Sequence, residues 1–206
     1  MLLNIPGSIV PEQEIITFEN SRQNYSQLIQ NVGRLAAVFE SNGIAKGDRI
    51  GLISTNRPEM IEAFFAAFQL GAVIVPINYR AKADELAYMI EDSGVKVLIL
   101  EHRYADLVAP ILNERKINLT ICIDQKHEIG SYYKDIISSI SKPLTKFVEV
   151  EDSDLAILMY TSGTTSRPKG VMITHGQLTS YVMNHTEAAD DTPRGSSMIR
   201  VIGYHI

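Results

Sequence analysis

The sequence contains a single cysteine and no tryptophan among its 206 residues. Cys122 therefore cannot form an internal disulfide, and it lies within the apolar run 119–123. A small thiol in such a run is typical of a buried structural residue in a reducing compartment. A catalytic thiol is the less favoured alternative.

Long hydrophobic runs and basic clusters are also missing. The most apolar stretch, residues 63–77, is interrupted by Gln69, Gly71 and Pro76, and it falls short of the roughly 20 apolar residues that a membrane-spanning helix needs. The N-terminus has neither the positive region nor the small-residue cleavage site of a secretory signal. The sequence thus predicts no transmembrane segment and a cytoplasmic location.

The charge balance excludes a further class of partner. The chain has 19 Lys+Arg against 24 Asp+Glu, a net charge of -5, whereas nucleic-acid binding usually requires a basic patch. We therefore expect no nucleic-acid partner. With 45% hydrophobic and 21% charged residues, the chain has the composition of a globular protein rather than a disordered one.

Helical and strand-like patterns alternate along the first 123 residues. Apolar residues at helical spacing predict helices over 25–40, 58–70, 84–92 and 104–113. Short apolar runs predict strands at 50–53, 72–76, 95–100 and 119–123, the first strand of the chain being expected at 50–53. Such alternation predicts an α/β fold with a mostly parallel sheet covered by helices on both faces.

Residues 126–154 show a weaker pattern, with one short helix expected near 133–140. No Gly/Ser-rich or Pro-rich linker marks a domain boundary there, so we interpret this stretch as an ordinary connection within one domain. No internal repeat is visible.

A hydroxyl-rich loop stands between two apolar runs. The strand expected at 155–159 leads into Tyr160-Thr-Ser-Gly-Thr-Thr-Ser-Arg-Pro-Lys-Gly170, and 171–174 has strand character again. Hydroxyl groups, free backbone N–H groups around a glycine, and the Lys169 cation form a concavity that suits polyphosphate oxygens. The hydroxyl side chains are Thr161, Ser162, Thr164, Thr165 and Ser166.

Two other interpretations of this loop are weaker. A Walker loop has its lysine after the second glycine and opens a helix, whereas here Lys169 precedes Gly170 and no helix start follows directly. A surface loop without any ligand is common for this composition, but the order of residues and the apolar flanks disfavour it.

Residues 160–170 resemble the phosphate-loop signature of the adenylate-forming superfamily, which includes acyl-CoA synthetases, luciferases and peptide-synthetase adenylation domains. The resemblance continues over most of the chain and is strongest to acyl-CoA ligases. The resemblance implies that the chain forms the N-terminal portion of the adenylate-forming fold, and that the fold is incomplete without the rest. The further segments that carry it are 25–28, 47–52, 56–59 and 70–78.

The resemblance implies a reaction and its binding residues. ATP, with Mg²⁺, activates a carboxylic acid, in our interpretation a fatty acid, to an acyl-adenylate; a thiol, usually coenzyme A, then displaces AMP to give a thioester. No covalent protein nucleophile and no protein-bound metal are expected. The residues implied to hold the β- and γ-phosphates are Thr161, Ser162, Gly163, Thr164, Thr165 and Lys169.

The histidines divide into two groups. Tyr204-His205-Ile206 resembles the start of an aromatic-His segment that lines the acyl and adenylate pocket, which implies a substrate-pocket role for His205. His102, His127, His175 and His185 lack metal-ligand spacing, and we expect solvated surface positions for them. A helix-start role is an alternative for His175.

Two departures from the family pattern limit these implications. Ser166 stands where the family has its second glycine, and the chain ends at Ile206, before the family's ribose-binding aspartate and its C-terminal lid domain with the catalytic lysine. We therefore expect residues 1–206 to be the N-terminal part of a synthetase domain, without turnover alone and prone to self-association through exposed edges. The alternative is a non-catalytic remnant acting as a binding module. The acyl chain and the choice between coenzyme A and a carrier protein stay open.

Overall fold

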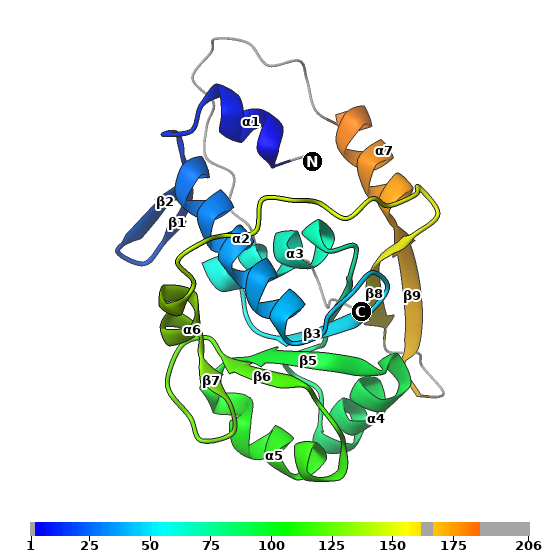
Figure 1. The fold of residues 1–206 in the computed structure, drawn as a ribbon. Coiled ribbons are helices and arrows are strands. Elements are labelled where there is room, and N and C mark those ends of the chain that lie inside the picture. Colours follow the sequence, from blue (N-terminus) through cyan, green and yellow to red (C-terminus); the bar gives the residue numbers. More distant parts are fainter. Residues whose placement is uncertain (1–2, 162–166, 186–206) are drawn as a thin grey trace.

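A seven-stranded sheet forms the centre of the computed structural model, which describes residues 3–161 and 167–185 (Figure 1). The strand order is β7-β6-β5-β3-β4-β8-β9, and every neighbouring pair is parallel except the antiparallel pair β8 and β9. The strands are β3 (Arg49–Ile53), β4 (Val73–Pro76), β5 (Val95–Leu100), β6 (Leu119–Cys122), β7 (Ser131–Tyr132), β8 (Leu155–Thr161) and β9 (Lys169–Thr174).

Helices cover both faces of this sheet. In Figure 1, α2 (Tyr25–Ser41) and α3 (Pro58–Gln69) lie above the sheet, while α4 (Ala83–Ser93) and α5 (Ala105–Glu114) lie below it. Successive residues of β5 enter two separate hydrophobic clusters: Val97 and Ile99 pack on the α2 side, and Leu98 and Leu100 on the α4 side. A strand buried on both faces is the mark of a parallel α/β sheet, and the predicted fold class is confirmed.

The predicted helices begin and end where local chemistry requires. Asn24 and Gln27 form a reciprocal capping box at the start of α2, and Pro58 occupies the first turn of α3, where no N–H is needed. Gly94 ends α4 in the left-handed conformation, with φ of 62°. The short helix expected near 133–140 is α6 (Tyr133–Ser139).

The prediction that the first strand lies at 50–53 was wrong. An antiparallel hairpin of β1 (Glu14–Phe18) and β2 (Ser21–Asn24) precedes it as a separate two-stranded sheet. β2 is wholly polar and the hairpin contains no buried residue, so hydrophobic periodicity carried no signal for it. The helix α1 (Asn4–Ile9), also without buried residues, and the two-residue strand β7 were missed for the same reason.

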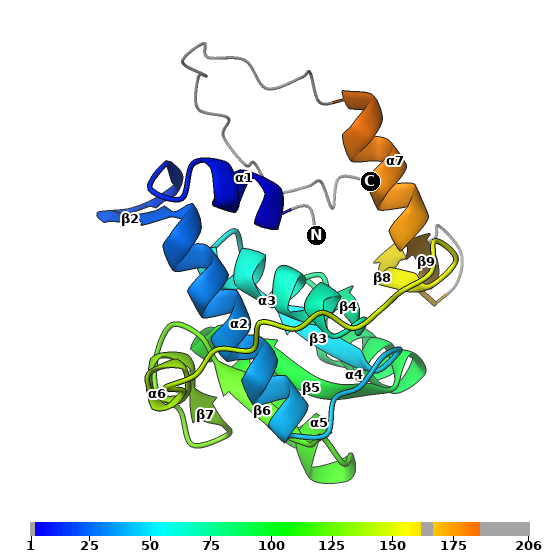
Figure 2. The same cartoon turned by 45° about the horizontal axis from the view of Figure 1, so that its top comes forward.

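The connection between α6 and β8 runs across the outer surfaces of α2 and α3 (Figure 2). The Gln69 side chain donates to the carbonyls of Leu144 at 2.8 Å and Lys146 at 3.0 Å. Near its end, Asp154 forms a 2.7 Å ion pair with Lys46. These contacts hold the connection against α3 and against the turn after α2. The chain then enters β8, which pairs with β4.

The structure also places Cys122 and bears on the expectation about membrane-spanning helices. Cys122 is fully buried in β6, as predicted, and burial raises the pKa of its thiol. Among the helices of residues 3–161 and 167–185, none is long and apolar enough to cross a bilayer.

Candidate functional site: the turn between β8 and β9

The hydroxyl-rich loop connects two strands that face each other in register. Thr161, the last residue of β8, lies directly opposite Lys169, the first residue of β9, and Tyr160 lies opposite Gly170. β8 is itself tied into the parallel part of the sheet through Ile157, which pairs with Ile74 of β4. The two ends of the loop are therefore fixed by a sheet rather than by a flexible connection.

The model brings together two of the predicted binding residues. Thr161 is half-buried and Lys169 is exposed at the mouth of the loop. The other predicted residues, Ser162, Gly163, Thr164, Thr165 and the pocket residue His205, lie outside the described residues.

Two cationic side chains lie at the end of the loop, where the chain enters β9. Arg167 and Lys169 both stand at the β9 end of the loop, and no carboxylate of the described residues forms an ion pair with Lys169. The guanidinium of Arg167 lies 5.1 Å from the ring centre of Tyr88 on α4. Cations without a carboxylate partner among the described residues, close to the Thr161 hydroxyl, are groups that attract phosphate oxygens.

Tyr160, which stands just before the loop, is held by a side chain of α4. The Tyr160 ring is buried, and its hydroxyl donates a 2.5 Å hydrogen bond to the Asp92 carboxylate of α4. Burial, reinforced by the neighbouring Asp92, raises the pKa of the Tyr160 hydroxyl far above its usual value. This hydroxyl therefore stays protonated and donating throughout the neutral range.

At its far end, β9 leads straight into α7 (His175–His185). The Thr174 hydroxyl accepts from the Gln177 N–H, and the Gln177 side chain accepts from the Thr174 N–H, which forms a capping box. α7 begins at His175, so the structure agrees with the alternative of a helix-start position for this residue.

The expectation that the four remaining histidines are solvated was wrong for His175. The His175 ring packs edge-on against Phe68, with ring centres 5.6 Å apart, and burial lowers its pKa. His102 forms a 2.7 Å contact with the Asp124 carboxylate, and its side chain remains 40% exposed at the surface. His127 is half-buried, and the His185 side chain lies outside what the structure describes. In the described part of the chain, no group of three or more His, Cys, Asp or Glu side chains could hold a metal ion.

A second polar cluster lies apart from the loop. The Glu62 carboxylate, 2% exposed on α3, accepts from Gln23 at 2.7 Å, from Asn31 at 2.8 Å and from the Tyr133 hydroxyl. Burial raises its pKa, while the three hydrogen bonds work in the opposite direction. The cluster joins the hairpin, α2, α3 and α6, and its contacts are those of a structural junction.

Sequence reasoning missed Asp92 and Glu62. Asp92 stands in the last turn of a helix, where the helix dipole disfavours a carboxylate, and this local mismatch was the available signal. Glu62 interrupts the apolar residues on the buried side of α3. A carboxylate in such a position requires partners, but nothing local reveals that they come from three distant segments.

The AMP-binding enzyme family model matches residues 9–202. A medium/long-chain-fatty-acid–CoA/3-oxocholest-4-en-26-oate–CoA ligase of Mycobacterium marinum is 31% identical over 189 residues, which cover 87% of this chain and 34% of the relative. The chain spans about a third of the length of the curated relatives it matches.

Solved structures have the same fold. A Mycobacterium tuberculosis fatty acyl CoA synthetase is 30% identical and superposes with a TM-score of 0.72 over 84% of this chain and 34% of its own. ATP-bound MatB from Rhodopseudomonas palustris is 28% identical, with a TM-score of 0.68 over 79% of this chain and 32% of its own. The family match covers nearly the whole chain, and this chain belongs to the AMP-binding enzyme family.

Proposed function

We propose that this chain is the N-terminal part of an ATP-dependent acid–thiol ligase, and that the turn between β8 and β9 binds the β- and γ-phosphates of ATP. The observation that carries the proposal is the register of Thr161 opposite Lys169. This register presents a hydroxyl and a cation together at the mouth of the hydroxyl-rich loop. Charge-assisted hydrogen bonds from such groups are the strong contacts available to phosphate oxygens.

The chemistry assigned to the complete ligase is electrostatic. Lys169 and the loop hydroxyls neutralise phosphate charge and hold the triphosphate while a substrate carboxylate attacks the α-phosphorus. Pyrophosphate leaves and an acyl-adenylate forms; the thiol of coenzyme A then displaces AMP. We propose that Mg²⁺ enters with the nucleotide, while Arg167 and Lys169 supply positive charge at the β9 end of the loop.

The acid we propose is a fatty acid, and the acceptor thiol coenzyme A. The M. marinum relative and the M. tuberculosis structure carry fatty-acid names, although the former also names a steroid acid. We further propose a cytoplasmic location, because free ATP and coenzyme A are the substrates. The 206-residue polypeptide by itself is expected to form no thioester, since positioning of both reactants supplies much of the rate in such chemistry.

A binding module without catalysis is the competing function. Such a module also requires a folded sheet. In this case, however, Lys169 should contribute no more to nucleotide binding than any other exposed lysine. Lys142 provides the matched comparison, because it is exposed and lies in the connection that crosses α2.

Isothermal titration of the purified chain with MgATP tests the proposal. We expect Lys169→Ala to weaken binding by about tenfold or more, because a charge-assisted hydrogen bond contributes about 1.5 to 3 kcal/mol. Lys142→Ala should bind like the unsubstituted chain. Equal affinities for both variants, or no binding by the unsubstituted chain, would contradict the proposal.

A further inference from the structure

Four residues connect α4 to both ends of the loop. Tyr88 and Asp92 stand one turn apart on α4, a spacing that places them on the same side of the helix. Tyr160 precedes the loop and contacts both of them, through the hydrogen bond to Asp92 and an edge-on ring contact to Tyr88 with centres 6.4 Å apart. Arg167, near the end of the loop, stacks over the other partner, Tyr88.

The position of Asp92 is electrostatically unfavourable for a carboxylate. It lies two residues before the C-cap Gly94 of α4, beside Glu91, and the last turn contains no basic residue. A carboxylate there opposes the helix dipole. Its two oxygens accept instead from tyrosine hydroxyls, Oδ2 from Tyr160 at 2.5 Å and Oδ1 from Tyr88 at 3.4 Å.

The neighbouring carboxylate shows that this arrangement is specific to Asp92. Glu91 occupies the same helical turn, but it forms a 2.8 Å ion pair with Arg115 and not with β8 or β9. The two residues therefore share a helical turn and a charge but have different partners. Glu91 is the natural control for Asp92.

We propose that Asp92 is a positioning residue for the phosphate-binding turn: by holding the Tyr160 hydroxyl, it fixes Thr161 and Lys169 in the register that receives the phosphates. The inference rests on the proposed function. Asp92 itself touches no phosphate. Its effect passes through Tyr160 to the adjacent Thr161, and across the strand pair to Lys169.

This role predicts an effect with the opposite sign to simple electrostatics. A carboxylate near an anion site repels the anion, so deletion of its charge should strengthen binding of ATP. A positioning role predicts that Asp92→Ala weakens binding, because the Tyr160 hydroxyl loses its acceptor. Asp92→Asn removes the charge but keeps an acceptor oxygen, and it should bind MgATP at least as tightly as the unsubstituted chain.

The experiment compares Asp92→Ala, Asp92→Asn, Tyr160→Phe and the control Glu91→Ala by two readouts on the full chain. The first is hydrogen exchange of the backbone amides of β8 and β9, followed by NMR without nucleotide. Asp92→Ala and Tyr160→Phe should speed exchange by about tenfold, as expected for loss of one anchoring hydrogen bond. Asp92→Asn and Glu91→Ala should not change it.

The second readout is MgATP affinity by titration. Asp92→Ala and Tyr160→Phe should each weaken binding by about five- to tenfold, and the double variant should be no weaker than either single one. The inference is overturned if Asp92→Ala shows the same amide exchange rates as Glu91→Ala, or if it binds MgATP more tightly than the unsubstituted chain. If the unsubstituted chain binds no MgATP, the proposed function fails, and the exchange readout alone decides whether Asp92 positions the turn.

Discussion

The backbone carbonyl of Gly33, in the middle of α2, accepts a 2.9 Å hydrogen bond from the N–H of Leu144. The connection to β8 thus touches the helix at a residue without a side chain. A Cβ added at Gly33 would lie 2.7 Å from the Leu144 carbonyl oxygen and 3.0 Å from the Pro143 Cβ.

Gly33→Ala is therefore expected to destabilise the protein. Alanine normally stabilises a helix interior by about 0.5–1 kcal/mol relative to glycine, but the clash with backbone should outweigh this gain and lower the free energy of unfolding by about 1–3 kcal/mol. Urea denaturation measures the change. Gln30→Ala, at an exposed position of the same helix, serves as control, and a Gly33→Ala protein more stable than the unsubstituted one would refute this packing.

The buried Glu62 should make stability depend on pH in an unusual direction. Burial raises the pKa of this carboxyl above its usual 4.5, so the folded state takes up the proton more readily than the unfolded state. Its contribution to stability is full below the unfolded pKa and is lost as pH rises through the folded pKa.

Thermal unfolding of the unsubstituted chain and of Glu62→Gln between about pH 8 and pH 5 tests this linkage. Glutamine keeps an oxygen for Gln23 and Asn31 and does not titrate. The unsubstituted chain should gain stability relative to the variant as the pH falls. Parallel pH profiles for the two proteins would show that Glu62 has no raised pKa. Burial lowers the pKa of His175 from its usual 6.5, so its contribution to stability is lost as the pH falls through the same window, but it is present in both proteins and its effect cancels from the comparison.

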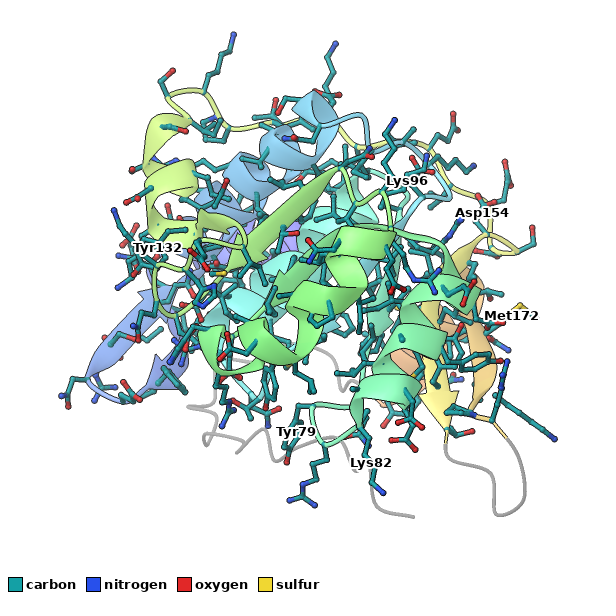
Figure 3. All side chains as sticks on the ribbon, turned by 90° about the horizontal axis from the view of Figure 1, so that it is seen from below. Tyr79, Lys82, Lys96, Tyr132, Asp154 and Met172 are labelled. Atoms are coloured by element: carbon teal, nitrogen blue, oxygen red, sulfur yellow. The ribbon has the colours of Figure 1, made fainter. Side chains whose placement is uncertain are left out.

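The edge strand β9 should cause self-association. In the described part of the sheet β9 has a partner on one side only, and it exposes Val171 (44%) and Met172 (68%); Met172 lies on the outside of the strand in Figure 3. Unpaired edges with apolar side chains pair with other chains.

Met172→Lys should therefore reduce association, because a charged edge residue opposes strand pairing. Size-exclusion chromatography with light scattering measures the effect. Ile9→Lys replaces an equally exposed apolar residue, 70% exposed on α1, and should leave association unchanged. An unsubstituted chain that stays monomeric at every concentration, or equal effects of the two variants, would contradict this role of β9.

Hydrophobic periodicity predicted the elements that bury apolar surface and failed where no side chain is fully buried. The strands β3 to β6 and the helices α2 to α5 carry the core, and each was predicted within a few residues. In the hairpin β1–β2 the strands pair with each other, and the consecutive residues Ile15 and Ile16 pack partly buried against the core without alternating with polar residues. Such contacts leave no periodic signal in the sequence.

The candidate site was likewise predicted only in part from the sequence. The motif from Tyr160 to Gly170 located the loop, because the order of its residues is visible in the sequence without the fold. Asp92 could not be found from the motif, since it lies 68 residues before Tyr160 and reaches it only when α4 packs beneath β8. Contacts that join distant segments require the fold, not only the sequence.

The central claim is that the turn between β8 and β9 binds the phosphates of ATP. Its most direct test is to map NMR shifts of the backbone amides as the chain is titrated with MgATP, magnesium tripolyphosphate and adenosine. The account predicts that MgATP and tripolyphosphate both shift the amides of Thr161 and Lys169, that adenosine does not, and that Lys169→Ala abolishes the tripolyphosphate response. Shifts confined to other parts of the chain, or none with either phosphate compound, would contradict it.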